Sequence, residues 1–284
     1  RTFAMELLLA QQSVDSNAAL AKQSFCRALR LNPFCLEAVA ALIRLRAETL
    51  LDADLVATLE KAYPWFRGWR MALSSQANNN HGMTELVLPQ LLQAHPRHPG
   101  LMAQFAICKL HNDSHQAARN WFCKARVVDP QYTHNMDLYG GMLRDDGKID
   151  QLDRLGKELL DANMKTPEPW VIGAMFCEMK GERDKAVVFV DKALELDPMH
   201  HTAYLEKANI AVGQARHHAA AIMFRNAYLI QPTIDVFYGL IGVYESLGKS
   251  HEAVSLAKEA FRIHKKNPKA YALLAGVVYR GPEG

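Results

Sequence analysis

Small and large hydrophobic residues recur along the chain in a fixed order that is tied to prolines. Pro96 and Pro130 are 34 residues apart, Pro130 and Pro198 are 68 apart, and Pro198 and Pro232 are again 34 apart. Proline cannot continue a helix, because it lacks the amide hydrogen and its ring clashes with the preceding turn. A proline at this period predicts a junction between helices that recurs about every 34 residues.

The same stripe of an alanine, a large hydrophobic residue and a second alanine precedes four prolines. Residues three or four apart share one helix face, and small residues on that face let a neighbouring helix approach closely. The stripe therefore predicts a helix that packs tightly on a partner. The four sets are Ala21, Phe25 and Ala28; Ala118, Phe122 and Ala125; Ala186, Val190 and Ala193; and Ala220, Phe224 and Ala227.

Each unit of the chain is thus predicted to be a first helix, a short turn, a second helix and a proline junction. Gly147, Gly181 and Gly248 fall at the expected turn between the two helices. A unit of this length and pattern is typical of the tetratricopeptide repeat. We predict an all-α fold, namely a right-handed tetratricopeptide-repeat superhelix (an α-solenoid) of about eight helix pairs with the last incomplete.

The repeat pattern predicts one continuous array over residues 1–284, regular at 1–33 and 100–284 and irregular at 34–99. Pro64–Phe66 and Asn78–Gly82 interrupt the irregular stretch, for which a separate domain is the alternative. Residues 269–279 supply only a first helix, and the chain does not open with methionine. We therefore expect it to be part of a longer protein.

Composition restricts the class of partner. Of the 284 residues 49% are hydrophobic and 22% are charged, with a net charge of +3, as in an ordinary globular protein. A nucleic-acid-binding protein usually has a strong basic excess, so we expect no nucleic-acid partner.

No run of about eighteen apolar residues predicts a membrane span. The five cysteines form no C-x-x-C pair, and we interpret them as buried thiols in a reducing compartment.

Candidate catalytic and metal-binding motifs are incomplete. Gly248–Ser250 resembles the end of a phosphate-binding loop, but Val243 stands where that motif requires glycine. The pairs His200–His201 and His217–His218 have no further ligand at metal-binding spacing and are interpreted as exposed turn histidines. Neither a G-x-S-x-G elbow nor an H-E-x-x-H helix occurs. We predict a protein that is not an enzyme, with no catalytic residues, no cofactor and no metal.

The first helices of such repeats line a concave face, which is the candidate binding site. Positions two, five, nine and twelve of each unit are expected to point into it, and they are acidic, amide-bearing or hydrophobic. Such a face suits a peptide with basic residues, through charge-assisted hydrogen bonds. The alternative is that these are merely solvated helix residues. The candidate groove residues are Asp137, Arg144, Glu178, Asn209, Tyr238 and Glu245, with Glu168, Val171, Met175, Leu205 and Asp235 at related positions.

One stretch goes beyond a general repeat. Asp129–Pro130, followed by Met136–Tyr139 and later by Glu168–Trp170, resembles the repeat subunits of the anaphase-promoting complex. Segments 138–144, 168–172 and 238–241 carry the same resemblance. It covers most of the chain and is strongest at 127–278.

The resemblance implies a non-catalytic scaffold in a ubiquitin ligase that acts in mitosis and the cell cycle, in the nucleus and the cytoplasm. It also implies other repeat subunits of that complex as partners and a homodimer in the full-length protein. The alternative is a free-standing tetratricopeptide adaptor or co-chaperone that binds peptide tails. Co-chaperone grooves hold a terminal carboxylate with lysines and arginines, whereas the candidate groove here is mostly acidic or amide-bearing.

Overall fold

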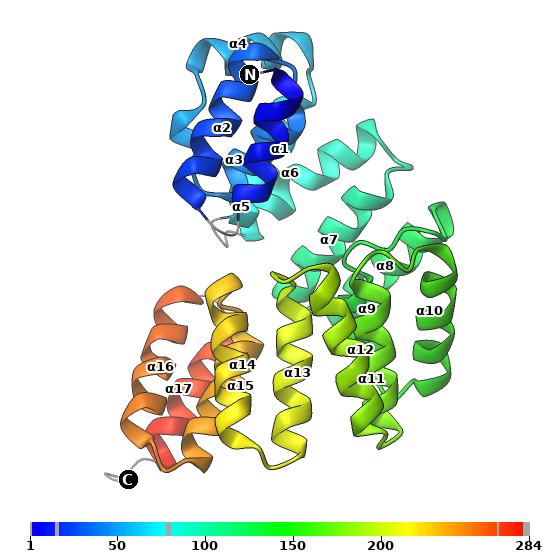
Figure 1. The fold of residues 1–284 in the computed structure, drawn as a ribbon, viewed down its shortest axis with the longest axis vertical. Helices are drawn as coiled ribbons and strands as arrows, with labels where there is room; N and C mark the ends of the chain where they lie inside the picture. The colour runs from blue at the N-terminus through cyan, green and yellow to red at the C-terminus, as the bar shows by residue number, and fades with distance from the viewer. Residues whose placement is uncertain (1, 15–16, 78–80, 266, 281–284) are drawn as a thin grey trace. The chain divides into compact units, whose positions relative to one another are not determined.

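The computed structural model of this chain describes residues 2–14, 17–77, 81–265 and 267–280. Within these ranges the chain forms seventeen α-helices and one 3-10 helix and no strand. Figure 1 labels the α-helices. Taken in chain order, the α-helices give eight pairs and one further helix, α17 (Pro268–Arg280). The predicted all-α tetratricopeptide-repeat fold is confirmed.

The chain divides into two compact units, residues 1–128 and 129–284, and each is described by itself. Whether they form one continuous array stays a prediction. In unit 1 the helices are α1 (Phe3–Ser13), α2 (Ala18–Leu31), α3 (Leu36–Arg44), α4 (Ala53–Ala62), α5 (Phe66–Ala77), α6 (His81–Ala94), α7 (Pro99–His111) and α8 (His115–Val128), with the 3-10 helix η1 (Glu48–Leu50) between α3 and α4.

The stretch predicted to be irregular contains an aromatic cluster. The rings of Tyr63 and Trp65 pack in a tilted arrangement at a centroid distance of 5.6 Å, and Trp69 contacts both Trp65 and Phe66. The Pro64–Phe66 interruption of the repeat pattern is thus the start of this cluster, which supplies large rings in place of the small-large-small stripe. Asn78–Asn80, in the second interruption, lie outside the described residues.

Unit 2 alternates first helices with odd numbers and second helices with even numbers (Figure 1). Its helices are α9 (Met136–Asp145), α10 (Ile149–Ala162), α11 (Glu168–Met179), α12 (Arg183–Leu196), α13 (His201–Gly213), α14 (His217–Ile230), α15 (Ile234–Ser246), α16 (Ser250–Ile263) and α17. The predicted stripe residues of α12 and α14 are fully or almost fully buried. Their small side chains let the first helices pack closely, as the sequence pattern predicts.

The five cysteines are free thiols. Cys108 and Cys177 are buried, as predicted, and burial raises the pKa of Cys108 to about 12. The prediction that all five are buried is wrong, because Cys123 is exposed and Cys26 and Cys35 are half-buried.

Four helix–helix turns of unit 2 share one backbone geometry. Gly147, Gly181 and Gly248 have φ angles of 70°, 76° and 70°, and Ala215 has φ 58° at the equivalent place. In each turn the next backbone N–H donates to the carbonyl oxygen five residues before it, at 2.9 Å. This hydrogen bond ends the first helix in a left-handed turn, a conformation that favours glycine.

We expect Ala215→Gly to raise the free energy of unfolding by about 0.5–1 kcal/mol. The substitution relieves the strain of a left-handed alanine, which costs roughly 1–2 kcal/mol. Part of this gain is lost because glycine has more conformational entropy in the unfolded chain. Urea denaturation measures the change. Ala219→Gly, in the exposed part of α14, is the matched control and should lower stability instead. A loss of stability in Ala215→Gly would contradict the assignment of strain to this turn.

A second prediction concerns the close approach of α15 to α14. A Cβ atom on Gly239 would lie 2.3 Å from two ring carbons of Phe224, a side chain that is buried and cannot swing away. We expect Gly239→Ala to lower the free energy of unfolding by about 1–3 kcal/mol through overpacking. Gly242→Ala on the same helix meets no atom within 4 Å and should raise it slightly. Equal effects of the two substitutions in urea denaturation would refute this account.

Candidate partner-binding site

The first helices of unit 2 present equivalent positions on one face. Arg144 and Asn209 are each the ninth residue of their helix, and Asp235 and Tyr238 are the second and fifth residues of α15. Steps of three, four and seven residues return to nearly the same side of an α-helix. Positions two, five and nine therefore form one stripe along each first helix, as the repeat spacing predicts.

Three of the six predicted groove residues come together in one pocket. Arg144 of α9, Glu178 and Met179 of α11, and Asn209 of α13 line a hollow of about 270 Å³, here called the Arg144 pocket. Three successive first helices thus contribute to it. A fourth predicted residue, Glu245, is half-buried on α15 and does not line this pocket.

Arg144 is held in place by a buried carboxylate on α13. Its Nη1 donates to both carboxylate oxygens of Glu206, at 2.6 and 2.7 Å, and its Nε donates to Asp145 at 3.2 Å. Glu206 is only 1% exposed. The bridge spans 62 residues and passes over α11, so it joins repeats that are not neighbours in sequence.

The charges of this bridge depend on each other. Burial raises the pKa of Glu206 to about 7, although Arg144 opposes the rise. Burial also disfavours the charge on Arg144, but the Glu206 and Asp145 carboxylates outweigh it and hold the pKa of Arg144 above its ordinary value. The short N–O distances are those of an ionised pair.

Asp137 does not face a groove, and its predicted role as a free carboxylate is wrong. It is 2% exposed, and its Oδ2 lies 3.2 Å from Nε2 of His200, the residue that precedes α13. Burial alone would raise the pKa of Asp137, but His200 lowers it below its ordinary value. This second bridge also joins α9 to the residue before α13, and the burial of Asp137 keeps its carboxylate away from any ligand.

The side chain of His200 is half-buried, at 14% exposed, and is not an exposed turn histidine. Burial disfavours its charge, but Asp137 and Asp197 outweigh that and raise the pKa of His200 to about 10. His201 differs, because burial lowers its pKa to about 4. The interpretation of this pair as exposed turn residues is therefore wrong.

Three further positions that were expected to point into the groove are buried between helices. Glu168, Val171 and Met175 of α11 are 5% exposed or less. Because α11 lies between α9 and α13, these two helices cover some of the positions on α11 that the repeat spacing had directed into the groove. Val171 therefore cannot contact a ligand.

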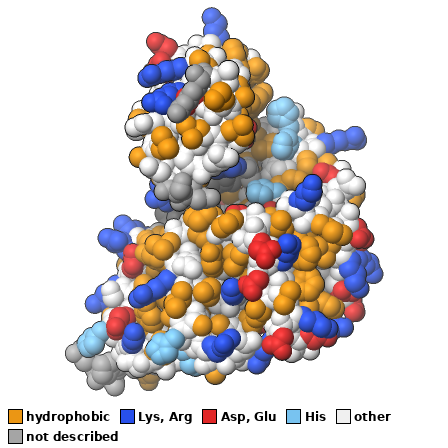
Figure 2. All heavy atoms as spheres, in the orientation of Figure 1, with side chains coloured by type: hydrophobic (Ala, Val, Ile, Leu, Met, Phe, Trp, Pro, Cys, Tyr) orange, Lys and Arg blue, Asp and Glu red, His pale blue; other side chains and the backbone are white. Residues whose placement is uncertain are grey.

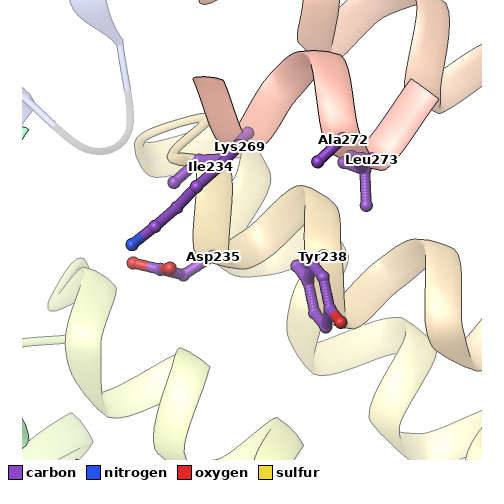
Figure 3. A pocket seen from close by; sticks show the side chains of 6 residues that line it. All are labelled: Ile234, Asp235, Tyr238, Lys269, Ala272 and Leu273. Atoms are coloured by element: carbon purple, nitrogen blue, oxygen red, sulfur yellow. The ribbon is translucent and has the colours of Figure 1, made fainter. Parts of the chain in front are cut away.

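Tyr238 belongs to a second hollow, of about 350 Å³, between α15 and α17. It is 72% exposed. In Figure 3 the side-chain ends of Lys269 and Asp235 point toward one another on one side, and Tyr238 lies apart from them. This hollow, the Tyr238 pocket, is lined by Ile234, Asp235, Tyr238, Lys269, Ala272 and Leu273.

Sequence reasoning missed Glu206, although a local signal was present. Its neighbours at three residues before and four residues after, Ala203 and Ile210, are hydrophobic and buried. A glutamate on the hydrophobic face of a helix needs a buried partner, because an unpaired charge is costly to bury. That signal predicts a bridge but not its partner.

Among the described residues, no three histidine, cysteine or acidic side chains gather where they could hold a metal ion. In the same part of the chain, no helix has both the length and the apolar character needed to cross a bilayer. Basic and acidic side chains are interspersed on the face that Figure 2 draws.

Stacked helix pairs, buried alanine stripes and glycine turns at a period near 34 define this chain as a tetratricopeptide-repeat protein. No family model matches it. Solved structures show the same fold: the crystal structure of the APC/C hetero-tetramer Cut9-Hcn1 (TM-score 0.59, 14% identity) covers 96% of this chain and 54% of that one. A tetratricopeptide repeat protein from Parabacteroides merdae (TM-score 0.53, 12% identity) covers 97% and 98%.

In sequence, the chain is similar to anaphase-promoting complex subunit 7. It is 26% identical to that protein of Arabidopsis thaliana over 291 residues, which are 98% of this chain and 52% of the relative. For the Homo sapiens subunit 7 the identity is 23% over 265 residues, or 91% and 47%. Segments 138–144, 168–172 and 238–241 predict a likeness to subunit 7 in particular, and the comparison confirms it. The chain spans about half the length of these curated relatives.

Proposed function

We propose that this chain is part of a non-catalytic scaffold subunit of the anaphase-promoting complex, a ubiquitin ligase, and that it mediates protein assembly in cell-cycle control. The observation that carries the proposal is the similarity to subunit 7 over nearly the whole chain, in relatives from four species. The helical-repeat fold supports it, because stacked helix pairs expose long surfaces to partners.

The polar groups of unit 2 support a structural role rather than catalysis. Two charge pairs, Arg144 with Glu206 and His200 with Asp137, join α9 to α13 and the residue before it across α11. A general acid or base must instead be free to exchange a proton with a substrate. These pairs stabilise the stacking of repeats, which is what a scaffold requires.

The partners of the proposed subunit are the other repeat subunits of the complex, and the full-length protein is a homodimer found in the nucleus and the cytoplasm. The relatives include anaphase-promoting complex subunit 3 of Schizosaccharomyces pombe, 24% identical over 182 residues, which is also a subunit of that complex by name. Light scattering on the purified full-length protein tests the dimer: a mass of one chain at micromolar concentration would contradict it.

Affinity purification of the tagged full-length protein from its own cells tests the assembly role. We expect the subunits of the ligase to co-purify in comparable amounts through a high-salt wash. An unrelated tetratricopeptide protein with the same tag is the control. Recovery of chaperones without ligase subunits would overturn the proposal and favour the adaptor function instead.

A terminal-carboxylate clamp is disfavoured by the geometry of the Arg144 pocket. Such a clamp needs cationic side chains that are free to meet a carboxylate. Here the guanidinium of Arg144 already donates to Glu206 and Asp145, and Glu178 adds a further carboxylate to the lining. An incoming carboxylate would meet repulsion in this pocket.

A further inference from the structure

The Arg144 pocket contains polar groups without partners. Within the described residues, neither the carboxylate of Glu178 nor the side-chain amide of Asn209 has a hydrogen-bonding partner, although both line the pocket. Burial raises the pKa of Glu178 above its ordinary value, although Arg144 and Arg183 oppose this. The carboxylate has thus lost part of its hydration without gaining an equivalent contact.

The charges around the pocket do not balance. The positive groups near the pocket are Arg144 and the exposed Arg183. The negative groups are the carboxylates of Asp145, Glu178 and Glu206. When all three carboxylates are ionised, two positive and three negative groups leave an excess of one negative charge. A cationic side chain that entered the pocket would restore the balance and would give Glu178 a charge-assisted hydrogen bond.

The Tyr238 pocket offers a different chemistry on the next two first helices. Tyr238, Leu273, Ile234 and Ala272 are in its lining (Figure 3). An exposed tyrosine beside aliphatic side chains is a surface that suits a hydrophobic side chain of a partner. The ring is 72% exposed, so binding such a side chain would withdraw it from water.

The two pockets follow one row of first helices inside unit 2. One lies among α9, α11 and α13, and the other lies between α15 and α17. Adjacent packed helices are roughly 10 Å apart, and α11 and α15 are two such spacings apart, so about 20 Å separates Glu178 from Tyr238. An extended chain rises about 3.3 Å per residue and covers that span in about six residues.

We propose that unit 2 binds an extended segment of a partner protein through two side chains about six residues apart, a lysine or arginine in the Arg144 pocket and a hydrophobic residue in the Tyr238 pocket. The segment needs no free terminus, because Glu178 and Asn209 contact a side chain. This inference deepens the proposed scaffold role by stating the chemistry of the partner. It rests on that role only for the identity of the partner.

Met179 lines the Arg144 pocket, so its methyl group is a local reporter of the occupancy of the pocket. The chain labelled with ¹³C-methyl methionine is titrated with Gly/Ser peptides of about twelve residues, blocked at both ends, that carry arginine or lysine and a phenylalanine six residues away. We expect a saturable shift of the Met179 resonance, which is assigned by its loss in Met179→Leu. A peptide with glutamine in place of the arginine or lysine should bind at least tenfold more weakly. A peptide whose cation and phenylalanine are only two residues apart should be weakened similarly.

Paired variants separate the pocket from general electrostatics. Glu178→Gln should weaken the cationic peptide at least fivefold, whereas Glu195→Gln removes the same charge from the second helix α12 and should change nothing. Tyr238→Ala should remove the preference for phenylalanine over serine in the peptide. Three results would each overturn the inference. They are equal affinities of the Glu178→Gln and Glu195→Gln variants for the cationic peptide, equal affinities of the wild type for the glutamine and cationic peptides, and the absence of a saturable shift.

Failure of this inference differs from failure of the proposed function. If the tagged wild-type protein co-purifies with ligase subunits but no peptide binds, only the two-pocket mode is wrong. If no ligase subunit co-purifies but the peptides bind as described, the scaffold assignment is wrong and the binding site stands.

Discussion

Replacing Arg144 with methionine is expected to lower the free energy of unfolding by about 3–5 kcal/mol at pH 8. The guanidinium is the hydrogen-bonding partner of Glu206, which is 1% exposed and would be left as an uncompensated buried charge. Urea denaturation followed by circular dichroism measures the loss.

The double variant Arg144→Met, Glu206→Met distinguishes a lost charge pair from lost packing. It removes both charges and keeps similar volume, so we expect it to recover most of the stability. If it is as unstable as Arg144→Met, the loss comes from the aliphatic stem of Arg144 rather than from the unpaired carboxylate. Lys192→Met, which removes an exposed ion pair with Glu195, is the control and should change the free energy by less than about 1 kcal/mol.

The free energy of unfolding of the Arg144→Met variant should also depend more strongly on pH than that of the wild type. Burial already raises the pKa of Glu206 to about 7, and loss of the guanidinium raises it further. A carboxyl group whose folded pKa lies above its unfolded pKa destabilises the protein as pH rises between the two values. The loss of unfolding free energy in the variant, relative to the wild type, should therefore become smaller from pH 8 toward pH 5, where Glu206 binds a proton. A deficit that is constant with pH would contradict this cause.

The helices and their pairing could be predicted from the sequence because both follow from local pattern. The stripe of Ala220, Phe224 and Ala227 defines a buried face within one helix, and the period near 34 repeats it. The turn at Ala215 is the exception that the pattern does not show, since alanine stands there in place of glycine. Backbone hydrogen bonds and close packing enforce the turn geometry without the favoured residue.

The candidate site could be predicted only in part, because it depends on how repeats curve. The structure brings Arg144 and Asn209, which both stand at position nine, to the lining of one pocket. The bridges from Asp137 to His200 and from Arg144 to Glu206 join residues 63 and 62 positions apart. Such contacts pass over the intervening repeat, and a pattern that describes one repeat and its neighbour contains no information about them.

Those two bridges assign a mechanical role to α9, α11 and α13. Both begin on α9 and end on α13 or the residue before it, and α11 lies between them. A load that pulls these repeats apart must break two buried ion pairs as well as hydrophobic contacts. The three first helices should therefore move as one block, which keeps the lining of the Arg144 pocket in register.

The last prediction uses the second bridge, through His200→Asn. At pH 6 we expect the variant to lose about 3–5 kcal/mol of unfolding free energy, because the 2% exposed carboxylate of Asp137 loses its charged partner. The loss depends on pH in a defined way. The pKa of His200 rises from 6.5 to about 10 on folding, so its contribution is complete below pH 6.5 and disappears as pH rises through 10.

Asp137 has the opposite dependence. Its folded pKa lies below its ordinary value, so its contribution is present above the unfolded pKa and is lost only as pH falls through the folded pKa. The groups that face His200 are Asp137 on α9, Asp197 before α13 and Glu168 on α11. His200 holds the pKa values of Asp137 and Asp197 below their ordinary value, so neither of these two carboxylates changes its protonation in that window.

The difference between wild type and His200→Asn isolates this titration, because lysines and tyrosines elsewhere contribute equally to both proteins. Urea denaturation at intervals from pH 6 to pH 10 should show the two free energies converge as the pH rises. Asp137→Asn should give the same convergence, since it removes the other half of the bridge. Parallel curves across the window would mean that His200 is neutral when folded, and that α9 and α13 are joined by packing rather than by charge.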